Sequence, residues 1–122
     1  MNWLNIIGLI FLGGGLGSVS RFGIWKLTSV IWQTRFPIGT VIANLLACTL
    51  LGIMVYYFKD KSTTNLFIRF FVIVGFCGGF STFSTFSFEN VILIKEGFYL
   101  YGFANVLISI LLSFVILWAL IK

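Results

Sequence analysis

The sequence predicts an all-α integral membrane protein with one domain, residues 1–122, and four transmembrane helices. Of its residues, 60% are hydrophobic and 9% are charged, whereas a soluble domain carries roughly 25% charged residues. The mean hydropathy of +1.11 points the same way. Because a bilayer core of about 30 Å requires about 20 helical residues per crossing, the apolar runs at about 3–25, 37–58, 66–96 and 98–121 predict four spans.

The first span, residues 3–25, begins at Trp3, an aromatic residue suited to the membrane interface. Its sequence GGGLGSVSRF places Gly13 and Gly17 four residues apart, a spacing that lets a second helix backbone approach closely. Met1 and Asn2 provide no basic stretch before it, so we expect a retained helix rather than a cleaved signal peptide.

The second span begins with Pro37, which fits a first helical turn because the N–H groups there have no intrahelical acceptor. Its interior, GTVIANLLACTLLG, contains a single amide side chain, Asn44. An amide in hydrocarbon requires a hydrogen-bond partner or water. Asn44 is therefore a candidate functional residue.

The third span, residues 66–96, is too long for one straight crossing, because its 31 residues would form a helix of about 46 Å at about 1.5 Å per residue. Near its middle lies CGGFSTFSTFSFE, with two glycines, five hydroxyl residues and a carboxylate. We predict a break at Gly78–Thr82. Backbone groups freed at bilayer depth are tolerated only where protein or a water-filled path receives them, so the break marks a candidate site.

The fourth span, residues 98–121, carries a polar stripe at intervals of four residues, which places its members on nearly one helix face. The stripe comprises Tyr101, Asn105, Ser109 and Ser113. It fits either hydrogen bonds between helices or the lining of a polar path, and hydroxyls can also bond to their own helix.

The ionisable residues argue against catalysis. Histidine is absent and the acids are Asp60, Glu89 and Glu96, so the chain lacks a His-based triad, a transition-metal cluster and a closely spaced carboxylate pair. The net charge of +5 comes from single Lys and Arg residues beside apolar runs, which indicates membrane flanks rather than a nucleic-acid surface. Cys48 and Cys77 are expected to pack as small apolar residues.

The distribution of basic residues gives no preferred orientation in the membrane. Four lie on the side of the second connection and the C-terminus (Lys59, Lys61, Arg69, Lys122), and four on the other (Arg21, Lys26, Arg35, Lys95). Since excess Lys and Arg on one side sets orientation, the balance predicts dual topology and antiparallel pairing, although so short a chain can reach it by chance. Four small helices also enclose little space, so a dimer is the expected unit.

The break combines groups that suit a small anion. Phenylalanine recurs at Phe80, Phe83 and Phe86 with hydroxyls between; ring edges are positive, and hydroxyl and amide groups donate. Such donors hold an anion weakly enough for it to leave. Arg21 and Glu89, ionisable residues in or near the hydrocarbon zone, are further candidates: Arg21 for a vestibule or structural ion pair, while the sequence leaves open whether Glu89 is its partner.

Three segments of this chain resemble the signatures of the CrcB/Fluc fluoride-channel family, in the family's order: GGGLGSVSRF, GTVIANLLACTLLG and GFCGGFSTFSTFSFE. The four-helix length matches as well. The resemblance implies an antiparallel, dual-topology homodimer in the bacterial cytoplasmic membrane, with two separate pores and a structural sodium ion at the dimer centre. It also implies passive fluoride export that relieves fluoride toxicity.

The resemblance assigns roles by matching motif. Phe83 and Phe86 would contact fluoride through their ring edges, and Asn44 would donate to it. Further hydroxyls would line the path, those of Ser84, Thr85, Ser109 and Ser113. The backbone carbonyls of Gly78 and Ser81 would bind sodium. Family members commonly have threonine where this chain has Ser81, so a carbonyl role carries over and a role specific to the hydroxyl does not.

Two alternatives stay open. Proton-coupled exporters of the small multidrug-resistance kind also have four helices and dual topology, but they resemble one another in a first-helix glutamate, where this chain has Arg21. The chain could instead be one subunit of a heterodimeric fluoride channel. The intact Asn44, Phe83 and Phe86 and the even charge count favour a self-pairing chain.

Overall fold

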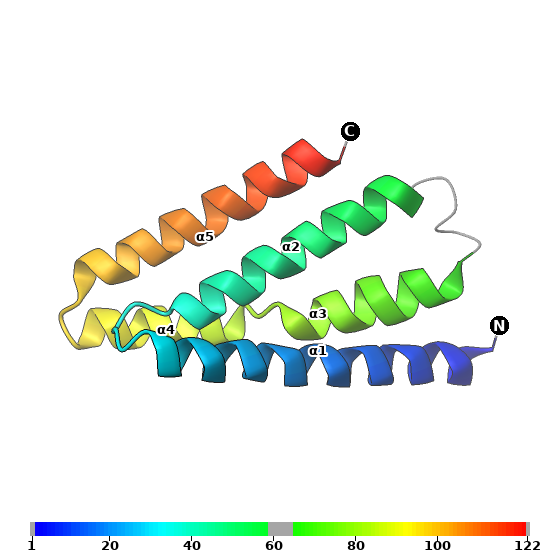
Figure 1. Cartoon of the computed structure of the whole chain (residues 1–122), viewed down its shortest axis with the longest axis horizontal. Coiled ribbons are helices and arrows are strands. Elements are labelled where there is room, and N and C mark those ends of the chain that lie inside the picture. Colours follow the sequence, from blue (N-terminus) through cyan, green and yellow to red (C-terminus); the bar gives the residue numbers. More distant parts are fainter. Residues whose placement is uncertain (1, 59–64, 122) are drawn as a thin grey trace.

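The computed structural model describes residues 2–58 and 65–121, and the regular structure within them is helical (Figure 1). The elements are α1 (Trp3–Ile31), α2 (Ile38–Phe58), the π-helix η1 (Phe67–Cys77), α3 (Gly78–Phe80), α4 (Ser84–Lys95) and α5 (Tyr99–Leu120). In these residues four segments are long and apolar enough to cross a membrane: α1, α2, Phe67–Lys95 and α5. The predicted four-span fold is confirmed.

The helices run back and forth, so that both chain ends lie toward the same end of the bundle. The N-terminus, the end of α2 and the C-terminus lie toward one end of the bundle, and the α1–α2 and α4–α5 connections toward the other (Figure 1). Helix α1 packs along η1 and α3, whereas α2 packs against α5 and α1. Of the basic residues counted for orientation, Lys59, Lys61 and Lys122 lie outside the described residues.

Helix α1 is longer than predicted. It was expected to end near residue 25 but continues to Ile31, with Trp32 in extended conformation after it. Residues 24–31 contain no proline or glycine, so no residue there interrupts the helix where the apolar run ends. The hydroxyls of Thr28 and Ser29 donate back to the Trp25 and Lys26 carbonyls. A change in hydropathy therefore did not mark the helix end.

Glycines form the contact between α1 and the third segment, as the spacing of Gly13 and Gly17 predicted. A Cβ at Gly13 would overlap the backbone of Phe71, and one at Gly17 that of Phe76. Gly79 faces α1 in the same way, since a Cβ there would overlap the backbone of Gly14. Small residues thus allow the two helix backbones to touch.

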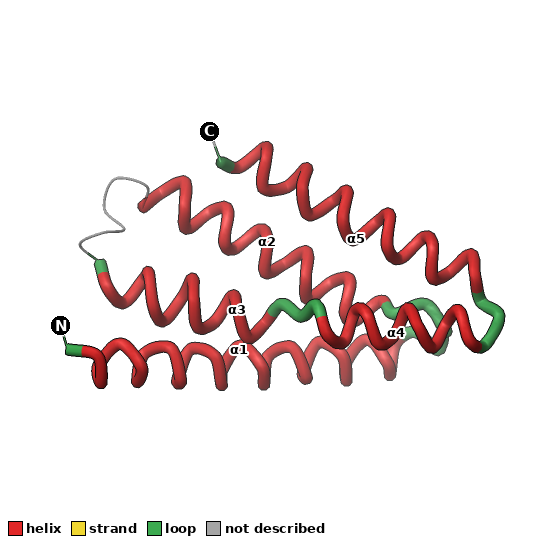
Figure 2. The backbone as a smooth tube through the Cα atoms, turned by 180° about the vertical axis from the view of Figure 1, so that it is seen from behind, coloured by secondary structure: helices red, strands yellow, loops and turns green. Residues whose placement is uncertain are grey.

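The break in the third segment is confirmed, but it starts later than predicted. Gly78 and Gly79 are helical, and the residues outside the helices are 81–83, the loop between α3 and α4 in Figure 2. Ser81 has an extended backbone, with φ −79° and ψ 158°. Gly79 allows close packing against α1 and does not itself interrupt the helix. The break falls on the Ser-Thr-Phe sequence at residues 81–83.

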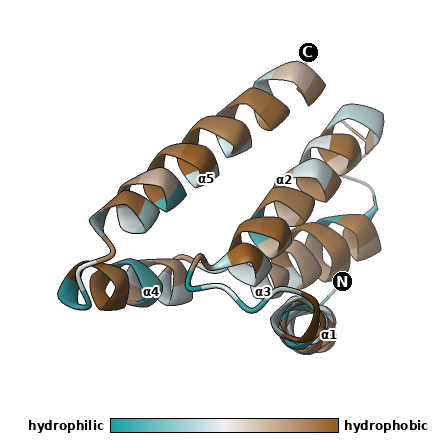
Figure 3. Cartoon of the chain, turned by 60° about the vertical axis from the view of Figure 1, so that its left-hand side comes forward, coloured by the Kyte–Doolittle hydropathy of each residue, from teal (hydrophilic) through white to brown (hydrophobic). Residues whose placement is uncertain are grey.

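Most of the outer surface is apolar. Hydrophobic colouring covers most of α5 and α2, whereas hydrophilic colouring is found on α4 and the α1–α2 connection (Figure 3). Many large apolar side chains are exposed, for example Leu100, Phe114 and Trp118 on α5. Such a surface is stable against lipid tails, and the polar groups of the interior then become the features that need explanation.

Candidate functional site

Asn44 holds the break in place from α2. Its Nδ2 donates to the Thr82 carbonyl at 3.1 Å, and its Oδ1 accepts from the Thr82 N–H at 2.7 Å. In a continuous helix that N–H would donate to the Gly78 carbonyl four residues earlier. One amide therefore supplies the hydrogen bonds that the broken helix gives up, and the Gly78 carbonyl loses its helical donor.

A groove of about 440 Å³ lies beside the break, between the third segment, α2 and α5. Its lining residues are Asn44, Cys48, Ser81, Thr82, Phe83, Phe86, Ser109, Ile110, Ser113 and Phe114. Five residues predicted for the pore, from three separate spans, are among them: Asn44, Phe83, Phe86, Ser109 and Ser113. The groove combines aromatic rings with amide and hydroxyl donors, and no ionisable acid or base is in its lining apart from the thiol of Cys48.

The two phenylalanines differ in their surroundings within one subunit. Their ring centroids are 6.0 Å apart with an interplanar angle of 38°. Phe86 is buried, with 8% of its surface exposed, whereas Phe83 is 79% exposed. Phe86 is thus fixed by its own subunit, and Phe83 projects from the loop.

Ser84 and Thr85 lie apart from that lining. Ser84 Oγ is 3.4 Å from Thr82 Oγ1, and the Thr85 N–H donates to Thr82 Oγ1 at 3.1 Å, so these residues organise the start of α4. Thr85 lines a second hollow of about 370 Å³, together with Arg21 and Thr40. The structure therefore places Thr85 beside Arg21 rather than in the groove, and Ser84 lines neither hollow.

Arg21 and Glu89 have separate partners. Arg21 Nε donates to the Gly79 carbonyl at 3.2 Å, and the Thr40 hydroxyl donates to Glu89 Oε1. The question of an Arg21–Glu89 pair is therefore answered: among the described residues, the ion pair found is Arg35–Glu96. Each of the two intramembrane candidates binds a neutral group on a neighbouring span.

The carbonyls predicted for sodium lie at the two ends of a short stretch. Gly78 is the first residue of α3 and Ser81 follows its last. The Ser81 side chain donates to the Cys77 carbonyl at 2.8 Å, so it stabilises the helix end. Carbonyl oxygens are hard ligands of the kind that alkali and alkaline-earth cations accept. The described residues contain no cluster of three or more His, Cys, Asp or Glu residues.

One member of the polar stripe of α5, Asn105, binds α4. Asn105 Nδ2 donates to Asn90 Oδ1 at 2.9 Å, and Ser109 Oγ donates to Asn105 Oδ1 at 3.0 Å. Sequence reasoning found Asn105 by its spacing but missed Asn90. The signal for Asn90 was present, since it is an amide in an apolar helix directly after Glu89.

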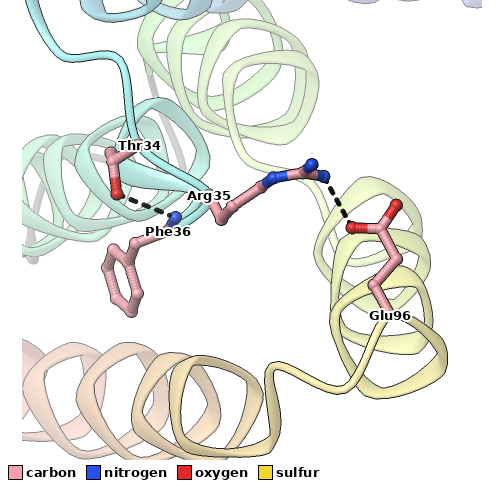
Figure 4. Close-up of polar contacts among 4 residues, drawn as sticks. All are labelled: Thr34, Arg35, Phe36 and Glu96. Atoms are coloured by element: carbon pink, nitrogen blue, oxygen red, sulfur yellow. Dashed lines mark hydrogen bonds and ion pairs between the residues drawn. The ribbon is translucent and has the colours of Figure 1, made fainter.

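An exposed ion pair joins the two connections at the same end of the bundle. Arg35 Nη1 contacts Glu96 Oε2 at 2.7 Å, as Figure 4 shows, and the Arg35 guanidinium is 5.4 Å from the centroid of the Phe98 ring. Nearby, the Phe36 N–H donates to Thr34 Oγ1 at 3.2 Å (Figure 4). No local pattern predicts this pair, because its members are 61 positions apart along the chain.

Four apolar spans, a broken third span and a groove of rings and polar side chains beside the break define a small multi-pass membrane protein. Residues 8–121 match the family model described as CrcB-like protein, Camphor Resistance (CrcB). The chain belongs to this family, so it is a bacterial membrane protein of a channel family rather than an enzyme.

The chain is similar to proteins named fluoride-specific ion channel FluC from several bacteria. It is 44% identical to one from Phocaeicola vulgatus, over 86% of each chain. It is 40% identical to one from Dehalococcoides mccartyi strain BAV1, over 86% of this chain and 81% of the relative. A relative from Flavobacterium psychrophilum is 36% identical over 94% of this chain and 93% of its own.

Proposed function

We propose that this chain forms a fluoride-selective channel that lets fluoride leave the bacterial cytoplasm passively. The observation that carries the proposal is the groove, where Asn44, Phe83, Phe86, Ser109 and Ser113 come together from three spans. The names of its relatives support the choice of anion. Ring edges and neutral donors attract a small anion without the fixed charge that would trap it.

Arg21, Thr40, Thr85 and Glu89 belong to the approach to this path in our proposal. Arg21 and Thr85 line the second hollow, which an anion would reach first because it contains the positive charge. Glu89 is tied to Thr40, and this bond directs the carboxylate toward a donor. The Ser84 hydroxyl contacts the Thr82 hydroxyl. In our proposal this contact holds the two hydroxyls at a position between the two hollows.

The working unit is an antiparallel homodimer of dual topology with two pores. Two observations support it. The even count of basic residues provides no orientation signal, and Phe83, an aromatic ring of the groove, is 79% exposed in one subunit. A second copy that covers Phe83 would close the groove into a path, and a heteromeric partner is not required for this.

A sodium ion would be held at the centre of the dimer by the Gly78 and Ser81 carbonyls of both subunits. The fit rests on Thr82, whose N–H donates to Asn44 and so leaves the Gly78 carbonyl without that donor. Carbonyl oxygens suit such a hard cation. When bound, the ion would supply a positive charge that attracts the carbonyls at the broken third span of each subunit. Asn44 positions these carbonyls by holding the chain after them.

Liposomes loaded with potassium fluoride test the function. Purified protein is reconstituted, a potassium ionophore is added, and a fluoride electrode records efflux. Rapid fluoride efflux with little chloride efflux from matched vesicles is expected. Absence of fluoride efflux from monodisperse protein would refute the homomeric channel. Efflux that requires an imposed proton gradient would instead indicate a coupled exporter.

A further inference from the structure

A buried chain of three polar side chains runs from α4 to the groove. Asn105 is fully buried, and Asn90 and Ser109 are also buried. Asn105 donates to Asn90, and Ser109 donates to Asn105, over distances of 2.9 and 3.0 Å. Ser109 is the member that also lines the groove. The amides thus act on the groove only through this hydroxyl.

The direction of these hydrogen bonds decides what Ser109 offers to the groove. A serine hydroxyl has one proton and two lone pairs. In this arrangement the proton is given to Asn105 Oδ1, so only lone pairs remain for the groove. Lone pairs repel an anion. Ser109 can donate to an anion only if Asn105 becomes the donor of their shared hydrogen bond.

The two amides can reverse only together. Rotation of a carboxamide by about 180° exchanges its oxygen and nitrogen with little change in shape. If both rotate, Asn90 Nδ2 donates to Asn105 Oδ1, and Asn105 Nδ2 donates to Ser109 Oγ. If one rotates alone, two oxygens or two N–H groups face each other in a buried site, which leaves them unpaired at a cost. The described buried side chains contain no unpaired polar atom, and joint reversal preserves this.

On the basis of the proposed function, we propose that Asn90 and Asn105 are positioning residues for Ser109. An anion in the groove stabilises the arrangement in which both amides are reversed and Ser109 donates to it. When the anion leaves, the hydroxyl turns back to Asn105. Asn90 and Asn105 therefore allow the Ser109 hydroxyl to donate when an anion is present. Neither amide contacts the anion itself.

A double-mutant cycle in the liposome assay tests this mechanism. Asn90→Asp removes the Nδ2 donor that the reversed arrangement of hydrogen bonds requires. In this variant Asn105 must donate to residue 90, and Ser109 must donate to Asn105. Fluoride efflux should fall by about tenfold or more, the loss expected for one hydrogen bond to a charged group. Ser109→Ala should cause the same loss, and the double variant should be no slower than either.

Asn65→Asp is the matched control. It makes the same chemical change at an exposed position, where the side-chain oxygen accepts from the Ile68 N–H and a carboxylate can do the same. Its efflux should equal that of the wild type. Wild-type efflux from Asn90→Asp would overturn the inference while leaving the channel intact, and so would wild-type efflux from Ser109→Ala. An equal further loss when Asn90→Asp is added to Ser109→Ala would also overturn it, because the new charge would then act directly. A wild-type protein without efflux refutes the channel and this inference together.

A measurement on the wild type is independent of whether Asn90→Asp folds. Solid-state NMR of labelled protein in bilayers resolves the side-chain amide nitrogens in saturating fluoride and in chloride. The signals of Asn90 and Asn105 should both shift in fluoride, because the Asn90 nitrogen gains Asn105 Oδ1 as an acceptor and the Asn105 nitrogen exchanges Asn90 for Ser109. A shift of the Asn44 signal alone would overturn the inference.

Discussion

Asn44 and Thr82 bind each other through two hydrogen bonds, one in each direction, between α2 and the break in the third span. This relationship joins structure and proposed function in one side chain. The amide satisfies both polar groups of a peptide residue that has no helix around it. It also brings α2 against the loop that carries Phe83. A single residue therefore maintains the break and forms a wall of the groove.

Replacement of Asn44 by the similarly sized leucine should lower the free energy of unfolding. The Thr82 N–H and carbonyl would both lose their partner, and an unpaired group in such a site costs about 1–3 kcal/mol. Unfolding followed by circular dichroism in detergent measures the change. Asn5→Leu, at an exposed position on α1, is the control and should change stability by less than about 0.5 kcal/mol. Equal stability of the two variants would contradict this role of Asn44.

Phe83→Ile should abolish fluoride efflux without loss of folding. Isoleucine keeps an apolar side chain on the loop but removes the ring edge that we propose to contact fluoride. Because Phe83 is mostly exposed within the subunit, little packing is lost with it. Phe103→Ile on α5, also exposed and outside the groove lining, should conduct normally. Efflux from Phe83→Ile at the wild-type rate would contradict the proposed contact between the Phe83 ring and fluoride.

Gly79→Ala should be strongly destabilising, although alanine favours helices. Its Cβ would overlap the backbone of Gly14 on α1, and backbone cannot move aside as a flexible side chain can. Overpacking of this kind costs about 1–3 kcal/mol or more. Gly15→Ala meets open space and should be neutral or stabilising. Thermal unfolding in detergent compares the two, and a stable Gly79→Ala protein would mean that α1 and the third span are less tightly packed.

Glu96→Gln should have a small effect despite the short contact with Arg35. The two side chains are 43% and 62% exposed, and exposed ion pairs contribute about 0–1 kcal/mol because water and salt screen them. The free energy of unfolding should fall by less than about 1 kcal/mol and the difference should vanish in high salt. A larger loss that persists in salt would indicate that the pair is shielded in the assembled protein.

The sequence allowed the spans and much of the groove to be predicted, because hydropathy and polar spacing are local signals. Asn44 and the stripe with Ser109 stood out against apolar neighbours. The end of α1 was missed because helix propensity continues where hydropathy stops. The break was placed too early because Gly79 could serve either a turn or a helix contact, and only the position of Gly14 distinguishes them. Bonds such as Thr40–Glu89 depend on the three-dimensional arrangement, which pattern alone does not supply.

The balance of basic residues predicts that the wild type inserts in both orientations. A C-terminal epitope should be cleaved from about half of the molecules when protease is added outside spheroplasts, because neither side has the excess of Lys and Arg that retains it in the cytoplasm. Asn2→Lys with Asn65→Lys raises the count on the C-terminal side from four to six. In this variant nearly all C-termini should be protected and fluoride efflux should fall, since antiparallel pairs become rare. Asn2→Gln with Asn65→Gln is the neutral control, and C-termini confined to one side in the wild type would rule out dual topology.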